Sequence, residues 1–438
     1  MINGKSRFVL LASTIIISLL VFSDFAHASR RGGRFPAPPP PAVTPNWTSL
    51  TGSSTTDSGN DIAIDGKGNV VVVGTTFGSI NGDPLQGNQD IFIAKYNKTG
   101  DLLWTHQIGT VDYERYAGIN IDSSGNIYAV GSSTGSLAAS NQGGNDIILD
   151  KYDSDGNLLW IRQYGTSGTD RGNAVGTDSS GNVYICGETS GSFGAANTTF
   201  NTDAYLARLD SAGDIQWIDQ FSSSPQLGSG ESCNDLAVDV NDNIYITGFT
   251  PGALQAGASG AEFYVKKYDP ADHVIWLTER DSVYYNVSNS IAVDAVGNTY
   301  VAGTGGLDSP VSGLADAFIV KFDEAGVEQW NRLLQSTGQE SMQGIAVDAA
   351  GKVYAAGFTS GSIAAANSRD TDILLARYDS NGRRLSLVQK ATTSWDQANG
   401  IAVNSDGTDY YLVGSTDGDL DGEINNGAYD LFVTRNRP

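Results

Sequence analysis

Apolar and polar residues alternate along this chain in short runs, and no stretch has a convincing helical period. The run "IDSSGNIYAVGSSTG" at 121–135 returns as "TDSSGNVYICGETSG" at 177–191. β-Branched and aromatic residues are enriched within the runs, and Asp, Ser, Gly and Asn separate them. Alternation of this kind, divided by turn residues, predicts antiparallel β-hairpins.

The repeated stretch belongs to a series of seven units. Six units contain an aspartate in a motif like "IAVD" and the seventh has asparagine there, at Asp65, Asp122, Asp178, Asp239, Asp294, Asp348 and Asn404. These positions are 54 to 61 residues apart, and each unit has room for four short strands. One such unit cannot cover both faces of its own sheet, so neighbouring units must stack. The series predicts an all-β fold, a seven-bladed β-propeller of four-stranded antiparallel blades.

The two ends of the repeat region predict how the ring closes. In most units a tryptophan stands eighteen residues before the motif aspartate, but the last unit ends at "DLFVTRNRP" without such a run. The missing run is found near the N-terminus in "NWTSL", where Trp47 precedes Asp65 by eighteen residues. An open solenoid would gain nothing from this arrangement, whereas a ring loses its exposed sheet edges. We therefore expect the N-terminal strand to complete the last blade of a propeller spanning 46–438.

The units read approximately "GIAVDxxGNxYVxGxT...DxFIxKYDxxGNLLWxxQ" and resemble the bacterial SBBP family of seven-bladed β-propeller repeats. They are more distantly similar to NHL-repeat propellers. The resemblance covers roughly residues 46–438 and implies the propeller fold. It implies little about activity, because propellers host many unrelated functions.

The first residues have the features of a secretory signal peptide, with expected boundaries 1–28. Lys5 and Arg7 precede an apolar run, and "AHA" ends at Ala28. The apolar run is shorter than the roughly 20 residues of a membrane-spanning helix, so we expect no membrane span. Residues 29–45 are expected to form a proline-rich linker. The expected location is the periplasm, the cell surface or the extracellular medium.

The net charge limits the classes of partner that the protein is expected to bind. The net charge of −23 disfavours nucleic acids and anionic membranes. We expect a single folded domain and a monomer.

The two cysteines, Cys186 and Cys233, lie in successive repeats, and an oxidising compartment would allow them to pair. Two unpaired, buried thiols are the favoured alternative.

Strand order assigns each loop to a face of the ring. If the four strands of a blade are called a to d from the inside outwards, the a–b and c–d turns share one face, here the lower face. The b–c loops and d–a crossovers share the other, the upper face. The lower turns are short and built from Asp, Gly and Asn, whereas the upper loops vary, so binding is expected on the upper face.

Two sets of carboxylates fall at the upper ends of the strands. One set starts strand a: Asp57, Glu114, Asp170, Glu231, Glu340 and Asp396. The other starts strand c: Asp90, Asp146, Asp203, Glu262, Asp316, Asp372 and Asp430. The favoured interpretation is that each carboxylate accepts hydrogen bonds from loops of its own blade. The alternative is an acidic channel mouth that concentrates cations.

Aromatic residues interrupt the symmetry of the upper face. They stand in crossovers where other units have Thr, Gly or Gln, at Tyr113, Tyr116, Tyr284, Tyr285 and Trp395. Exposed rings beside Glu114 and Asp396 would suit a carbohydrate, or a peptide or protein ligand. Packing between crossovers is the alternative for each individual ring.

A metal-like pattern occurs in "DGDLDGEINNGAYD". Its candidate ligands for Ca²⁺ alternate around a glycine turn, with the last at the ninth position: Asp417, Asp419, Asp421 and Asn425. The loop is similar to calcium loops of integrin-type propellers, where the ninth position is usually Asp. Ala428 at the twelfth position argues against an EF-hand. A polar loop without metal is the favoured alternative.

The sequence favours binding over catalysis. Beyond the signal peptide the histidines are His106, on an expected outer strand, and His273, in a lower turn. Neither can meet the upper carboxylates, which disfavours a Ser-His-Asp or histidine-zinc site. A carboxylate-dependent hydrolase or lyase, for example with Glu114 and Asp146, is the remaining enzyme hypothesis. We expect an exported, non-enzymatic binding module, with a structural envelope or surface protein as the alternative.

Overall fold

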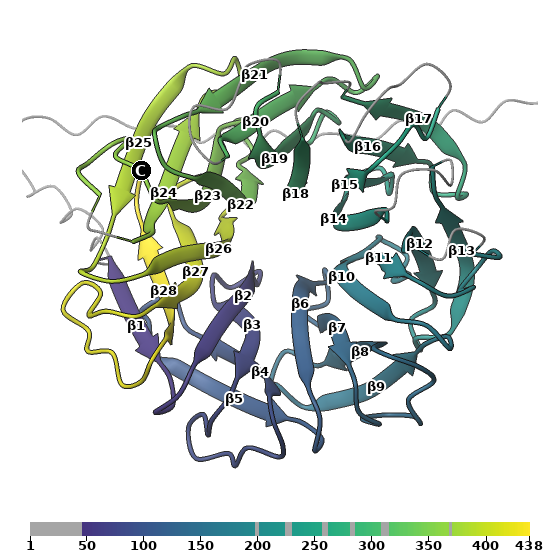
Figure 1. Ribbon diagram of the computed structural model, residues 1–438, viewed down its shortest axis with the longest axis horizontal. Helices are drawn as coiled ribbons and strands as arrows, with labels where there is room; N and C mark the ends of the chain where they lie inside the picture. Colours follow the sequence, from purple (N-terminus) through teal and green to yellow (C-terminus); the bar gives the residue numbers. More distant parts are fainter. Residues whose placement is uncertain are drawn as a thin grey trace, which may run out of the picture. The chain divides into compact units, whose positions relative to one another are not determined.

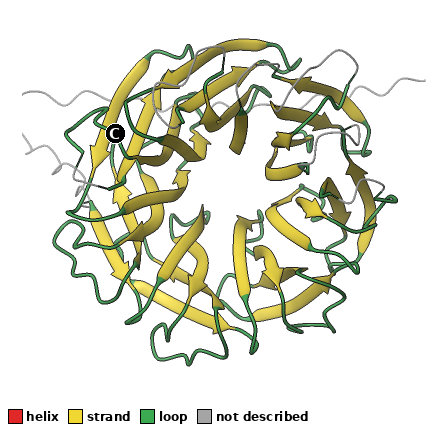
Figure 2. Ribbon diagram, in the orientation of Figure 1, coloured by secondary structure: helices red, strands yellow, loops and turns green. Residues whose placement is uncertain are grey.

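In the computed structural model, residues 46–197, 201–223, 230–255, 262–280, 285–307, 315–367 and 370–438 are described. These residues form seven four-stranded antiparallel sheets arranged radially around a central channel, and no helix occurs among them (Figures 1 and 2). The predicted seven-bladed propeller is confirmed. The expected signal peptide (1–28) and linker (29–45) lie outside the described residues.

Blades 1 to 3 each run from an inner to an outer strand in chain order. Their strands are β2 (Asp57–Ile64), β3 (Val70–Thr76), β4 (Asp90–Tyr96), β5 (Leu102–Ile108), β6 (Glu114–Ile121), β7 (Ile127–Ser133), β8 (Asp146–Tyr152), β9 (Leu158–Tyr164), β10 (Asp170–Thr177), β11 (Val183–Thr189), β12 (Asp203–Leu209) and β13 (Ile215–Phe221).

Blades 4 to 6 repeat this order. Their strands are β14 (Ser232–Val238), β15 (Ile244–Thr250), β16 (Glu262–Tyr268), β17 (Val274–Glu279), β18 (Asn286–Val293), β19 (Thr299–Gly305), β20 (Ala317–Phe322), β21 (Glu328–Leu334), β22 (Glu340–Val347), β23 (Val353–Thr359), β24 (Asp372–Tyr378) and β25 (Arg384–Lys390).

Blade 7 combines the two ends of the chain. Its inner strands are β26 (Asp396–Val403), β27 (Tyr410–Thr416) and β28 (Asp430–Asn436), and its outer strand is β1 (Trp47–Thr51). β1 runs antiparallel to β28, with Trp47 opposite Arg435 and Thr51 opposite Leu431. Figure 1 shows the purple β1 beside the yellow β28. The predicted closure by the N-terminal strand is confirmed.

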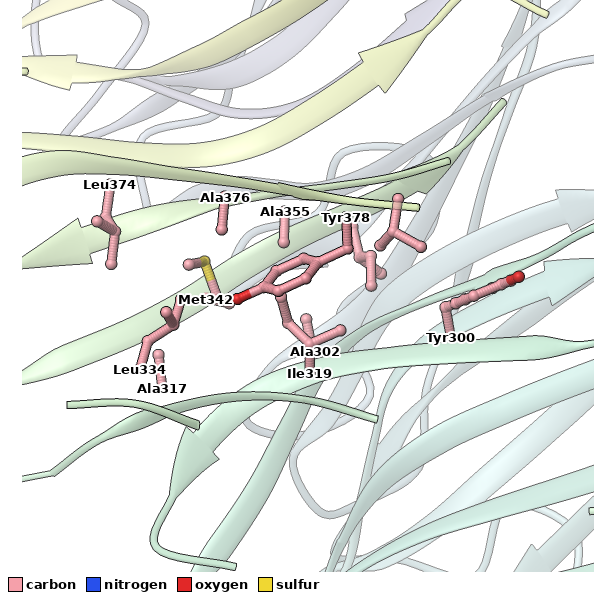
Figure 3. Packing of buried hydrophobic residues seen from close by; sticks show 12 residues of the cluster. Tyr300, Ala302, Ala317, Ile319, Leu334, Met342, Ala355, Leu374, Ala376 and Tyr378 are labelled. Atoms are coloured by element: carbon pink, nitrogen blue, oxygen red, sulfur yellow. The ribbon is translucent and has the colours of Figure 1, made fainter. Parts of the chain in front are cut away.

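Hydrophobic packing between blades forms seven separate cores, one at each interface. Figure 3 shows the core between blades 5 and 6, where Ala302 and Ile319 of blade 5 face Met342 and Tyr378 of blade 6. Side chains alternate across a strand, so each sheet sends apolar residues into the cores on both of its sides. This explains why strands b and c are apolar at nearly every position.

The core between blades 3 and 4 contains a disulfide. Cys186 in β11 is bonded to Cys233 in β14, and both residues have an exposed fraction of 0%. The expectation of two free thiols is therefore wrong. Strand b of one blade packs directly on strand a of the next, which brings the two Cα atoms to 5.7 Å, within the range of a disulfide.

A girdle of amide side chains surrounds the channel. Each strand a has a β-bulge, and at five bulges an asparagine donates its side-chain amide to a backbone carbonyl of the next blade: Asn60 to Tyr116, Asn173 to Cys233, Asn234 to Ser288, Asn289 to Met342 and Asn399 to Gly59. The last of these bonds, at 2.8 Å, joins blade 7 to blade 1. The girdle therefore reinforces the seam that β1 closes.

The substitution Asn399→Ala tests the girdle. It removes the amide at the seam, and Ala117 already occupies the same position in blade 2. We expect the free energy of unfolding in urea to fall by about 1 kcal/mol, the contribution of a typical hydrogen bond. Gln343→Ala is the control, because the side chain of Gln343 donates its hydrogen bond to Ser341 within its own blade. Equal losses in both variants would contradict a role in ring closure.

Candidate binding site

The carboxylates that start strand a anchor the crossovers that precede them. Glu114 is fully buried and accepts hydrogen bonds from the backbone N–H and hydroxyl of Thr110, at 2.9 and 2.6 Å, and from Ser133 at 2.8 Å. Asp396 is also fully buried and accepts bonds from Thr392 and Thr416. Burial raises the pKa of Asp396 above its ordinary value.

The carboxylates that start strand c have an equally local role. Asp90 accepts a bond from the backbone N–H of Gln86 and another, at 2.8 Å, from the side chain of Gln107 on the outer strand. The same pairing joins Gln163 to Asp146 and Gln389 to Asp372. The favoured prediction, that these carboxylates hold their own loops, is confirmed in these blades. Asp90, Asp146 and Asp372 are fully buried, so they contribute nothing to an exposed acidic rim.

The central channel contains a cavity of about 660 Å³. Its middle is lined by the asparagine girdle, and its upper end by Ser58, Arg115, Trp395, Gln397 and Ser415. Strand a runs from the upper to the lower face, so residues that start this strand lie at the upper mouth. The polar walls are mainly amides and hydroxyls, with one guanidinium and one indole at the entrance and two carboxylates deeper in the channel. Isoleucines supply the apolar part of the lining.

Two arginines occupy corresponding positions in blades 2 and 3. The second residue of strand a is Arg115 in β6 and Arg171 in β10, and it is uncharged in the other five blades. Arg171 forms an ion pair with Glu188. Arg115 is exposed and lines the channel. Sequence reasoning missed this pair because it followed acidic and aromatic residues. The signal was a cationic residue beside Glu114 and Asp170 in two successive units.

The predicted aromatic residues differ in their exposure to solvent, and three of them lie at the surface or at the channel. Tyr113 is 52% exposed and Tyr285 is 63% exposed. The ring of Tyr285 also contacts Phe249, with centroids 5.0 Å apart. Trp395 is half-buried, packs edge-on against Tyr429 and lines the channel. Tyr284 lies outside the described residues.

Tyr116 differs from the expectation of an exposed ring. It is 1% exposed and donates its hydroxyl to the buried carboxylate of Asp150. Tyr116 is the third residue of strand a, a position that faces the neighbouring blade rather than solvent. Glu114 and Asp396 are likewise buried, with their carboxylates bonded to loop residues. Of the predicted ligand contacts, Tyr113, Tyr285 and Trp395 are the described residues placed to meet a partner.

Two further carboxylates lie deeper in the channel, where other blades have Gly, Ala or Ser. Asp61 accepts the backbone N–H groups of Ile62 and Ile119, and thereby bridges blades 1 and 2. Asp235 accepts those of Leu236 and Ile291, and bridges blades 4 and 5. Burial, followed by the charge of Asp235, raises the pKa of Asp61 to about 7. Burial raises the pKa of Asp235 to about 6.

The candidate calcium ligands are directed at different partners. Asp417 accepts a bond from Ser394, and Asp419 accepts one from the backbone of Asn425. Asp421 pairs with Lys390 and accepts the hydroxyl of Thr48. Within the described ranges, no group of three or more His, Cys, Asp or Glu side chains is arranged to hold a metal. The calcium site stays a prediction.

Comparison with known proteins supports the repeat assignment. Residues 103–138 and 159–194 match the model of SBBP, a β-propeller repeat. The regulatory protein FlaEY of Caulobacter vibrioides is 23% identical over 380 residues, which cover 81% of this chain and 36% of that protein. An uncharacterized WD repeat-containing protein, L264 of Acanthamoeba polyphaga mimivirus, is 23% identical over 241 residues, covering 50% and 15%. The chain thus spans about a third or less of these curated relatives.

Solved structures with a related architecture are remote in sequence. Chaetomium thermophilum Sqt1 bound to the N-terminus of ribosomal protein L10 aligns with a TM-score of 0.46 and 10% identity, covering 83% of this chain and 84% of that one. A luciferin-regenerating enzyme aligns with a TM-score of 0.40 and 12% identity, covering 74% and 92%. Both TM-scores lie below 0.5, so neither structure assigns a ligand or an activity to this chain. Among the described residues, no helix has the length and apolar character needed to cross a membrane.

The raised pKa of Asp61 makes stability depend on pH. The folded state binds this proton more tightly than the unfolded state, so the contribution of Asp61 is present at low pH and is lost as pH rises toward 7. Asp61→Asn removes the titration. Relative to the native chain, the variant should gain on the order of 1 kcal/mol in unfolding free energy between pH 5 and pH 8.

Urea denaturation at both pH values measures this difference. Asp155→Asn, at an exposed lower-face turn, is the control and should show no such gain. A relative stability of Asp61→Asn that stays constant across this pH range would contradict the raised pKa.

Proposed function

We propose that this chain, which is built from SBBP β-propeller repeats, is an exported module that binds a protein partner through the upper face of its ring. The observation that carries the proposal is the upper mouth of the channel, where Trp395 and Arg115 line the entrance of a polar cavity. The exposed Tyr113 and Tyr285 directly precede strand a on the same face. The signal-like residues 1–28 support export.

The distribution of exposed rings supports a partner on this face. Among the described residues, three aromatic side chains have exposed fractions above 40%, namely Phe77, Tyr113 and Tyr285. Phe77 follows strand b, and the two tyrosines lie in crossovers, so all three belong to the upper face. Aromatic residues and arginine are enriched at the energetic centres of protein interfaces. Exposed aliphatic residues are less informative because they also occur on the outer strands and lower turns.

Carboxylate-dependent hydrolysis is the second candidate. It is favoured by Asp61 and Asp235, which line one cavity and have raised pKa values, a common property of catalytic acids. The hydrogen bonds of these carboxylates favour a structural role instead. Each aspartate accepts backbone N–H groups from two blades and thereby links them. The other blades have a small residue at the corresponding position. Binding therefore explains the site better than catalysis.

Selection from a displayed library of random peptides tests the proposed function. Peptides selected on the purified protein should bind Tyr113→Ala or Trp395→Ala at least about tenfold more weakly, as expected for aromatic interface centres. The controls are Val240→Ala and Val296→Ala, which truncate exposed residues in lower-face turns. Selected peptides that bind both upper-face variants as tightly as the native protein would refute binding at this mouth. Failure to select any peptide would also count against the proposal.

A further inference from the structure

The chain has 26 lysines and arginines against 49 acidic residues, yet Arg115 and Arg171 lie near each other at the upper ends of strand a in neighbouring blades. They occupy the same position of strand a in neighbouring blades, as the partners of Ser132 and Glu188 in strand b. Serine, valine and glutamine fill that position elsewhere. The two cations therefore distinguish one sector of an otherwise repetitive ring.

The two arginines differ in whether an acidic side chain pairs with them. Arg171 is paired with Glu188, so its charge is largely balanced. For Arg115, no hydrogen bond or ion pair is formed within the described part of the chain. Although Arg115 is open to the channel, partial desolvation by the channel walls, followed by the nearby charge of Arg171, lowers the pKa of Arg115, and Glu188 opposes this effect. A guanidinium placed beside another cation without its own counterion is a site where an anion gains most.

The surroundings of Arg115 define the space that is open to a ligand. The guanidinium borders the cavity of about 660 Å³, which also contains Ser58, Trp395 and Gln397 at its upper end. Tyr113 lies two residues before Arg115 and is half-exposed at the rim. A ligand in contact with Arg115 can therefore place an anionic group inside the mouth while its remaining surface covers the aromatic rim.

The nature of the walls favours a peptide over other anions. Below Arg115, the asparagine girdle presents amide groups, which can pair with the N–H and C=O groups of a peptide backbone. The exposed rings above supply apolar surface for side chains. A nucleic acid would bring many phosphates to a chain with a net charge of −23, whereas a peptide brings one or two carboxylates to the local arginine. At physiological salt the more distant charges are screened beyond about 8 Å.

We propose that Arg115 is a specificity-determining residue that receives a carboxylate from an acidic peptide segment inserted into the upper mouth of the channel. The peptide carries this carboxylate as an Asp or Glu side chain or as a free C-terminus. Arg171 is held by Glu188, so Arg115 is the cation of this pair that is available to the ligand. This inference rests on the proposed function, because it assigns the chemistry of the ligand at that site.

The peptide selection described above also tests this inference. Two libraries are used, one with internal random segments and one whose random segments end in a free C-terminus. The peptides selected from either library should share a carboxylate at one position. Replacement of that carboxylate by its amide should weaken binding at least about tenfold, as should Arg115→Gln, because a hydrogen bond to a charged group is lost. Arg115→Lys should restore part of the affinity. The control Arg384→Gln removes the same charge from an exposed outer-strand position and should leave binding unchanged. Circular dichroism and thermal melting verify that the variants fold.

The possible outcomes distinguish failure of this inference from failure of the proposed function. Peptides that require Tyr113 and Trp395 but show no preference for carboxylates, and that bind Arg115→Gln normally, would overturn this inference and leave the proposed function intact. Absence of any selected peptide would count against both. An oligogalacturonate titration adds a further arm. If this acidic saccharide binds in an Arg115-dependent manner while acidic peptides do not, the assignment to a peptide is wrong.

Discussion

The pairing of β1 with β28 is the interaction on which the rest of the molecule depends. Five consecutive residue pairs join the first strand of the domain to the last, so the outer edge of blade 7 is covered. Closure also places blade 7 against blade 1, which creates the seventh hydrophobic core. Without it, blades 1 and 7 would each expose an apolar face, and β28 would be an unpaired edge. The channel exists only because pairing of β28 with β1 closes the ring of blades.

Closure also positions the proposed site. Trp395 comes from the crossover into blade 7, Ser58 from blade 1 and Arg115 from blade 2. These residues share one cavity although more than three hundred positions separate the first two in the chain. The seam between blades 7 and 1 is therefore part of the upper mouth. The bond from Asn399 to Gly59 spans this seam next to the cavity lining, so ring stability and site geometry depend on the same contacts.

The sequence predicted the fold well because every blade repeats the same solution. The motif aspartates confirm this at the level of single turns: Asp65 accepts the backbone N–H groups of Lys67 and Asn69, and Gly68 adopts a positive φ. Such contacts lie within five residues and recur, so a repeated pattern reveals them. The anchoring role of Glu114 was predicted for the same reason, since its partner Thr110 precedes it by four residues.

The features that the sequence did not predict depend on contacts between blades. Tyr116 stands in a crossover motif rich in polar residues, but its position in strand a directs it into the core between blades 1 and 2. There its hydroxyl donates to the buried Asp150 in β8 of its own blade. Cys186 and Cys233 are 47 residues apart, and only the stacking of β11 on β14 brings them together. Arg115 and Asp61 were missed because they belong neither to the recurring carboxylates nor to the aromatic exceptions that were followed along the sequence. In a repeat protein the common residues build the ring, whereas residues that differ between blades give one sector its chemistry. The arginine pair at the mouth belongs to the second group, and for that reason a functional role explains it better than the needs of the fold.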